Sequence, residues 1–411
     1  MDNVTHSLAG LLLAESAVRL RRPEPRPEAL GRAGALVAIS SMIAANLPDA
    51  DLLYAGIGGD RLGYMLQHRG YTHTVLGAVA GALLVWLIVL LIWRSRWGQL
   101  PARSDVWWLL ALFLVSSGSH LVLDWTNSYG VHLFWPIENR WAYGDAVFIV
   151  EPWFWIIAVP ALVLATTSRV ARVLLTLVLA IGLVLAWQVS LVSRGAALAL
   201  TIGAAVSIAL AWRLPPGARV VVAVGGWLGV TLVMFAGSVS ARRTIERAVR
   251  GADPSAELLD VALTPLPANA VCLTAMSVER AGELYRVETA RVSAAPAITV
   301  AARCGGRESA GAPLHPSPRR STAGVQWDGE WSAPSGVLVA LARQSCPALA
   351  ALRFIRVPIW HAAADSSVML GDLRYGGAGT GFADVRVPVR SPTCQRAVPP
   401  WTPPRSDVLD F

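Results

Sequence analysis

Histidine and aspartate residues recur at the ends of apolar segments within the first 125 residues: His6, Asp49, Asp51, His68, His73, His120 and Asp124. An ionisable side chain in or beside a membrane-buried segment costs free energy unless it is paired or functional, so such residues mark a site. His120 and Asp124 are four residues apart and therefore share one face of a helix, where they can bind one cation. Imidazole and carboxylate together favour zinc, manganese or iron over calcium or magnesium.

These candidate ligands outnumber the four that one tetrahedral zinc ion needs, so we expect two or three metal ions. Paired ions can activate water and stabilise both the attacking and the leaving oxygen of a phosphoester. Arg69 lies between His68 and His73, and its planar guanidinium group is suited to hold a phosphate. Glu151 begins a later apolar segment on the same predicted face. It is a further ligand, an orienting partner of a ligand, or a carboxylate at a helix N-terminus.

Each motif has a structural explanation when it is taken alone. LPDAD can be a turn that begins at a proline and contains a capping aspartate, and the spacing of His120 and Asp124 can arise by chance. The joint occurrence of all the motifs on one predicted membrane face favours a metal site. His132, His315 and His361 lack such partners in the sequence, and we interpret them as structural.

The chain is 411 residues long, and 54% of it is hydrophobic while only 15% is charged. That composition excludes a disordered chain, and the length of the apolar segments excludes an ordinary soluble enzyme. Six segments are long enough to span a bilayer, namely 73–93, 105–125, 147–167, 170–192, 194–212 and 219–239. Two shorter segments, 7–18 and 33–47, are short spanning helices or a re-entrant pair. We therefore predict an all-α polytopic bundle of six to eight helices, followed by a β-rich soluble domain.

The net charge of +8 is carried by arginine, without any lysine. These arginines flank apolar segments, which indicates membrane orientation and no nucleic-acid partner. Alternate connections carry twelve arginines on one side and four on the other, so the first side is cytoplasmic and the candidate ligands lie on the extracytoplasmic face. MDNVTH lacks arginine, so segment 7–18 is not expected to be a signal peptide. Four arginines just after residue 240 oppose this orientation, although long translocated domains weaken the rule.

We predict four regions: a transmembrane helical domain with the metal site over 1–240, a helical connector over 241–264, a β-rich extracytoplasmic domain over 265–391 and a Pro-rich tail over 392–411. The runs LYRVETARV, GVLVALA, LRFIRVPIW and ADVRVPVR alternate as strands do. All four cysteines lie after residue 270, which suits two disulfides in an oxidising compartment; four buried free thiols are the alternative. The sequence leaves the connectivity open.

Several motifs, in this order, resemble those of the YdjM-type membrane-bound metal-dependent hydrolases: MDNVTHSLAG, NLPDAD, HRGYTHTVLG and SHLVLDWTNSYGVHLFWPI followed by FIVEPWFW. The resemblance covers residues 1–155 in detail, and that family is related to zinc phospholipases C and zinc nucleases. It implies a helical fold and a zinc site with the ligands His6, Asp49, His73, His120 and Asp124. Asp51, His68 and Glu151 are additional candidates. At Glu151 the chain departs from the family, which usually has Asp-Pro where this chain has Glu151 before Pro152, but the carboxylate is retained.

The sequence therefore predicts a metal-dependent hydrolase in the bacterial cytoplasmic (inner) membrane, with Arg69 and Asp51 as catalytic residues. A phosphoester substrate is favoured, either a phospholipid or a lipid-linked phosphate, because the site lies near the headgroup layer. The alternative is a metal-binding membrane protein without catalysis, for transport, sensing or partner binding. Ionisable residues stop at one face, which disfavours a transport pathway. No oligomeric state is specified.

Overall fold

The computed structural model describes residues 1–21, 27–55, 61–306, 313–365, 367–376, 379, 381–394 and 398–409, with only the main chain for 27–32. The chain forms two compact units. The helical unit comprises Met1–Ala50, Tyr71–Trp135 and Val147–Val233, and the β unit comprises Asp51–Gly70, Pro136–Ala146 and Met234–Phe411. The chain is therefore not divided at a single boundary near residue 240, because two short segments of its N-terminal half belong to the β unit.

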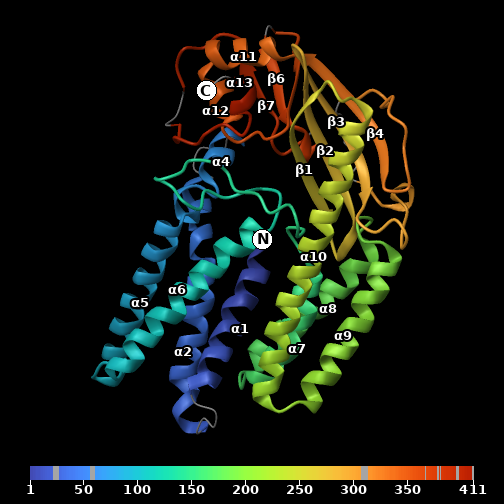
Figure 1. The fold of residues 1–411 in the computed structure, drawn as a ribbon. Coiled ribbons are helices and arrows are strands. Elements are labelled where there is room, and N and C mark those ends of the chain that lie inside the picture. Colours follow the sequence, from blue (N-terminus) through green and yellow to red (C-terminus); the bar gives the residue numbers. More distant parts are fainter. Residues whose placement is uncertain are drawn as a thin grey trace. The chain divides into compact units, whose positions relative to one another are not determined.

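The helical unit is built from helices that are mostly joined by short turns, with longer connections over 47–74 and 126–151 (Figure 1). In chain order these are α1 (Asn3–Arg21), α2 (Pro27–Asn46), the 3-10 turns η1 (Leu47–Asp51) and η2 (Tyr71–His73), α5 (Val75–Trp97), α6 (Arg103–Trp125), α7 (Pro152–Ala165), α8 (Arg169–Gln188), α9 (Arg194–Arg213) and the first part of α10 (Pro216–Ala252).

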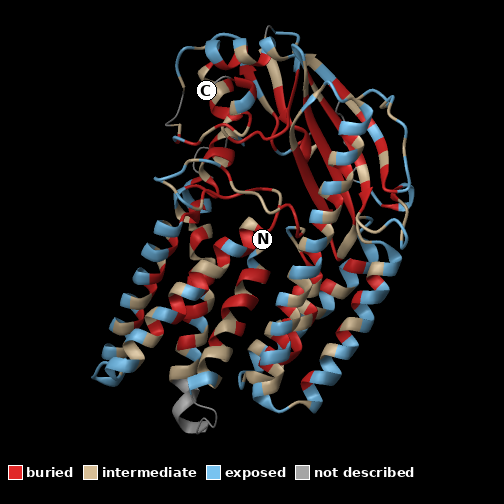
Figure 2. Ribbon diagram, viewed as in Figure 1, coloured by how far each residue is buried: buried red, intermediate tan, exposed pale blue. Residues whose placement is uncertain are grey.

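Six helical segments among the described residues are long and apolar enough to span a membrane: Ala33–Ala55, Val75–Trp97, Arg103–Trp125, Arg169–Gln188, Arg194–Arg213 and Pro216–Ala252. The prediction of a polytopic helical membrane domain is thus confirmed. Figure 2 shows exposed positions along these helices, and large apolar side chains such as Leu91, Leu174 and Ile202 occupy many of them. Exposed apolar side chains are expected on helices that face lipid.

One predicted span is wrong. Segment 147–167 forms only the 14-residue helix α7, which measures about 21 Å, shorter than the ~30 Å hydrocarbon core. The helix begins at Pro152 because a residue before proline avoids the α-helical conformation, and Glu151 is accordingly extended. The apolar residues before Glu151 lie outside the helix.

The N-terminal helices pack closely, and this packing positions their ends. α2, α5 and α6 share a buried core that includes Ala82, Leu109 and Phe113. α1 crosses α2 at Gly10, where a Cβ atom would lie 2.7 Å from the Ser41 carbonyl oxygen. Glycine is therefore required at this crossing, and Ser41 Oγ donates to the Gly10 carbonyl oxygen at 2.8 Å. The close approach brings the start of α1 to the end of α2.

The β unit contains two antiparallel sheets. The first has the order β1 (Glu257–Leu266), β2 (Asn269–Ala281), β3 (Leu284–Ser293) and β4 (Val325–Pro334), and the second has the order β5 (Pro358–Ala362), β6 (Ser367–Asp372) and β7 (Val385–Pro388). Short helices complete the unit: α3 (Leu52–Ala55), α4 (Arg61–Gln67), α11 (Ser335–Gln344), α12 (Cys346–Leu352) and α13 (Ser406–Leu409). The C-terminal part of α10 packs Ala241, Ile245 and Val249 against the first sheet.

The β-rich character is confirmed, and so are two disulfides, Cys272–Cys304 and Cys346–Cys394. Three local predictions differ from the structure. The run GVLVALA lies in the helix α11, since its buried residues Leu338, Leu341 and Ala342 have helical spacing. The segment 241–264 is helical only to Ala252 and is strand from Glu257, and in LRFIRVPIW only the last three residues are strand.

The Pro-rich end is packed within the β unit where it is described. Trp401 is fully buried, and its Nε1 donates to the carbonyl oxygen of Leu66 at 3.0 Å. The segment therefore contributes to the core of this unit and is not an extended tail at this point.

Candidate metal centre

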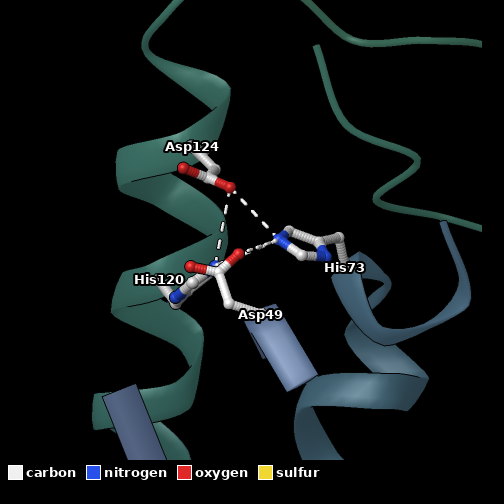
Figure 3. Close-up of side chains that lie close together, drawn as sticks. All are labelled: Asp49, His73, His120 and Asp124. Atoms are coloured by element: carbon white, nitrogen blue, oxygen red, sulfur yellow. Dashed lines mark hydrogen bonds and ion pairs between the residues drawn. The ribbon is translucent and has the colours of Figure 1, made fainter. Parts of the chain in front are cut away.

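Four side chains of the helical unit converge on one point (Figure 3). Asp49 comes from η1, His73 from η2, and His120 and Asp124 from successive turns of α6. One ligand atom from each lies within 4.8 Å of all the others. Both imidazole rings are fully buried, and only 9% of the Asp49 side chain is exposed. Four donors of zinc-binding type therefore share one buried location.

The distances between these donors fit a coordination polyhedron. The Nε2 atoms of His73 and His120 are 3.1 Å apart. His73 Nε2 lies 3.3 Å from Asp49 Oδ1 and 3.2 Å from Asp124 Oδ2, and His120 Nε2 lies 3.6 and 3.5 Å from the same two oxygens. An ion with four tetrahedral ligands at about 2.1 Å separates those ligands by about 3.4 Å. The five distances cluster around that value, so the donor set fits a tetrahedral ion such as zinc.

Each histidine is oriented through its second ring nitrogen. His120 Nδ1 is 2.7 Å from the Ala45 carbonyl oxygen, which only accepts, so Nδ1 carries the proton and the lone pair of Nε2 faces the centre. His73 Nδ1 is 3.1 Å from Thr72 Oγ1. Thr74 follows as the N-cap of α5 and accepts from Gly77 N at 2.9 Å. The start of α5 thereby fixes the position of His73.

Asp49 is oriented by a residue that the sequence did not single out. Asn3 Nδ2 donates to Asp49 Oδ2 at 2.8 Å, so Oδ1 is the oxygen that faces the two histidines. Asn3 is also 3.4 Å from Asn46 Oδ1. The available signal was the pair of amide side chains, Asn3 and Asn46, at the ends of otherwise apolar helices.

His6 approaches the centre from the other side of Asp124. Its Nε2 lies 3.3 Å from Asp124 Oδ1, and its ring stacks on His120 with centroids 3.7 Å apart. The α-amino group of Met1 contacts the same carboxylate. Asp124 thus presents Oδ2 to His73 and His120, and Oδ1 to His6. A carboxylate used in this way can bridge two metal ions.

Three other predicted site residues belong to the β unit. Asp51 Oδ1 is 2.9 Å from His68 Nδ1, and Asp51 Oδ2 accepts from the main-chain N of Arg69 at 2.8 Å. Arg69 is buried and adopts a left-handed conformation with φ of 58°. Asp51 therefore fixes both the His68 ring and the turn at Arg69.

Glu151 has the third of its predicted roles in this structure. It is the N-cap of α7, where its Oε1 accepts from Trp153 N at 3.2 Å, and its side chain is buried. Among the described residues it is not in a group of donors that could hold an ion. The interaction satisfies a main-chain donor at the start of an apolar helix, as N-caps do.

In comparison with protein families, residues 1–194 match the family described as YdjM inner membrane protein. Comparison with curated proteins and with solved structures gave no match. The matched region includes all four converging donors together with His6.

Proposed function

Residues 1–194 match the family described as YdjM inner membrane protein, and on this premise we propose that the chain is a membrane-bound metal-dependent hydrolase of phosphoesters. The protein is a multi-pass inner membrane protein, and its acidic and histidine side chains cluster as a possible metal-binding site. The hydrolytic activity, the metal and the substrate are parts of the proposal.

The observation that carries the proposal is the set of five interatomic distances of 3.1–3.6 Å among the four donors. Asp49, His73, His120 and Asp124 would hold one ion, and zinc fits their chemistry and spacing. Asp124 Oδ1 and His6 offer ligands for a second ion. Metal ions held there would polarise a phosphoryl oxygen and lower the pKa of a water molecule.

The positions of the donors along the chain support the proposed class of substrate. Asp49 lies six residues before the end of the span Ala33–Ala55, His73 precedes α5, and Asp124 lies in the last turn of α6, so all three are near ends of membrane-spanning segments. The ends of such segments lie at the level of the lipid headgroups. A phospholipid or a lipid-linked phosphate carries its phosphoester at that level. The catalytic roles of Arg69 and Asp51 stay predictions from the sequence.

We further propose that the site and the β unit are extracytoplasmic. Two disulfides suit an oxidising compartment, and the arginine distribution supports a cytoplasmic location for the opposite ends of the helices. A reporter that is active only in an oxidising compartment, fused after Phe411, should be active. Activity of a cytoplasm-specific reporter at the same position would contradict this orientation.

One observation favours a second candidate function. Four protein ligands around one tetrahedral ion leave no position for water, which is typical of structural zinc sites. The alternative is therefore a metal ion that holds η1, η2 and α6 together without catalysis. The two functions differ in whether Asp124 Oδ1 and His6 hold a second ion.

The experiment uses the full chain, purified into lipid nanodiscs, with its metal content measured beside hydrolysis of phospholipids and lipid-linked phosphates. We expect bound zinc, and we expect His120→Ala and Asp124→Asn to lower hydrolysis by at least ~100-fold, the upper end of what loss of a ligand's orienting partner costs. The matched control is His361→Ala, since His361 is exposed on β5. Bound metal without hydrolysis on any substrate would favour the structural role, and hydrolysis without metal would contradict both.

A further inference from the structure

Four arginines follow the last membrane-spanning segment, and neither the metal centre nor the predicted orientation accounts for them. Arg242, Arg243, Arg247 and Arg250 all lie in α10. This helix has 37 residues and is about 55 Å long, whereas the hydrocarbon core is about 30 Å thick. Roughly 20 residues from Arg219 bring the helix across the core, so Ser240 to Arg247 lie at the level of the headgroups.

The arginines are divided between two faces of α10. Arg242 serves the β unit itself, because its Nη2 donates to Asp145 Oδ2 at 2.8 Å. The other three are exposed and lie along one stripe, with Ala236 and Val239 continuing the same stripe towards the membrane segment. The opposite face is buried against the sheet through Ala241, Ile245 and Val249. The stripe therefore faces away from the core of its own unit.

The three exposed arginines have no acidic partner in the part of the chain that the structure describes. Among the described residues, no carboxylate lies within 4.0 Å of the guanidinium groups of Arg243, Arg247 or Arg250. The side-chain hydrogen bond seen here joins Arg247 Nε to the Arg243 carbonyl oxygen at 3.1 Å, within the helix. Three cations on one line of a helix repel each other, so an anion on this stripe would be favourable.

A hollow of about 540 Å³ lies along the stripe, and its lining changes from apolar to cationic along the helix axis. Its lining is apolar at the membrane end and cationic at the other end: Phe235, Ala236, Val239, Ser240, Arg243 and Arg247. A nucleic acid or an acidic protein would match only the cationic end, and the apolar end would stay against lipid. A lipid with an anionic headgroup matches both ends.

We propose that this face of α10 is a binding site for an anionic phospholipid. Its phosphate lies between the guanidinium groups of Arg243 and Arg247, and the first part of an acyl chain lies along Phe235 and Val239. Arginine suits this role because its planar group can donate two hydrogen bonds to one phosphate. The site is independent of the metal centre, and it explains arginines that the orientation of the chain leaves unexplained.

The test measures binding of phosphatidylglycerol and phosphatidylcholine to the full chain by native mass spectrometry and by thermal shift in detergent. We expect the anionic lipid to bind more tightly, with an affinity that falls as salt is raised. The double substitution Arg243→Gln and Arg247→Gln should weaken phosphatidylglycerol binding by about 10- to 30-fold, since each arginine near a lipid surface contributes ~1 kcal/mol. Phosphatidylcholine binding should not change.

Three further variants keep the test decisive. Arg320→Gln with Arg343→Gln removes the same charge from exposed positions elsewhere in the β unit and should leave lipid binding unchanged. Ala236→Trp fills the apolar end of the hollow without altering charge and should weaken both lipids. Arg250→Gln should weaken lipid binding less than substitution of Arg243 or Arg247, because Arg250 lies about 10 Å beyond Arg243.

Equal binding of the two lipids would overturn the proposal, and so would an unchanged affinity in the Arg243 and Arg247 double variant. Equal losses in the Arg320 and Arg343 variant would show a general effect of charge and would also overturn it. Displacement of the lipid by sn-glycerol 3-phosphate would instead identify a site for soluble phosphate. Intact disulfides in each variant would confirm that the β unit has folded.

Discussion

Buried carboxylates contact arginine in the β unit and histidine in the helical unit. In the β unit, the Arg319 guanidinium group lies 2.6 Å from Glu279, and Arg356 lies 2.9 Å from Asp145. In the helical unit, Asp49 and Asp124 face imidazole nitrogens at 3.2–3.6 Å. The first set has the lengths of charge-assisted hydrogen bonds, and the second has the lengths of coordination-polyhedron edges.

This difference teaches which feature separates a structural network from a metal site. Burial is common to both units, and so is a high local density of charge. The arginine networks satisfy their carboxylates with protein groups alone, whereas the histidine cluster directs two lone pairs and two carboxylate oxygens towards one another. Neutral imidazole and carboxylate groups at such distances are stabilised by a cation between them.

Metal removal should give the largest difference between the units. Because the ion binds only the folded state, chelation should destabilise the helical unit by several kcal/mol, about 4 if the ion is present at 1,000 times its dissociation constant. His120→Ala should lose the metal and lower the stability of the helical unit by the same amount. Chelation should not change the stability of the β unit, which contains the Arg356 network. Hydrogen exchange of each unit, with and without chelator, measures both effects.

The matched control for that prediction is Arg356→Met. It removes the buried cation that Asp145 and Asp260 share and leaves them only Arg242 and Arg405, so it should destabilise the β unit by up to about 3–5 kcal/mol without changing the metal content. Equal protection of the helical unit with and without chelator would mean that the histidine cluster is not a metal site.

The sequence predicted which residues come together better than it predicted how each of them is oriented. Helical spacing indicated that His120 and Asp124 share a face, and alternation of spans brought His6, Asp49 and His73 to the same end. Asn3 was missed because its role depends on the crossing of α1 and α2 at Gly10, a tertiary feature. Asp51 and His68 were predicted as additional ligands; within the β unit Asp51 Oδ1 lies 2.9 Å from His68 Nδ1, and their role as ligands stays a prediction.

Local pattern was a weaker guide elsewhere. The spans of α5, α6, α8 and α9 follow from their apolar length, but the run before Glu151 is equally apolar and is not helical. GVLVALA alternates like a strand over seven residues, yet its burial repeats every three to four residues in α11. The number of disulfides followed from counting cysteines, whereas the pairing depended on how β2, α12 and the loops fold together.

An effect of similar size is expected from pH in the β unit. Glu288 is fully buried, which raises its pKa to about 8; a proton shared with Glu330 and the charge of Glu279 add to this, while Arg319 and Arg286 oppose it. The folded state therefore holds a proton that the unfolded state releases above its usual pKa of 4.5. Stability from this group is fully present below pH ~4.5, falls as pH rises, and is lost above pH ~8.

Glu288→Gln tests this relation because it keeps the neutral form at every pH. The wild-type β unit should lose stability by up to ~1.4 kcal/mol per pH unit between pH 5 and 8, and the variant should lose less. Glu283→Gln, at an exposed position, is the control. Denaturant unfolding followed at several pH values measures it. The same slope in wild type and Glu288→Gln would show that Arg319 keeps Glu288 ionised throughout.

The smallest effect sharpens the comparison at the metal centre itself. Asn3 is exposed and touches no ligand atom that faces the histidines, but it binds Asp49 Oδ2 and so decides which way the carboxylate points. Asn3→Ala should weaken metal affinity by about 10-fold, the lower end for loss of an orienting partner, while the melting temperature at saturating metal is unchanged. Ser7→Ala is the control, because Ser7 lies one turn further along α1, and its Oγ bonds the Asn3 carbonyl oxygen and Asn46 Nδ2 but not Asp49. Affinity is measured by competition with a chelating dye. If Asn3→Ala and Ser7→Ala bound metal equally well, Asp49 would not need to be oriented, and the carboxylate would resemble those of the arginine networks, which are held by charge alone.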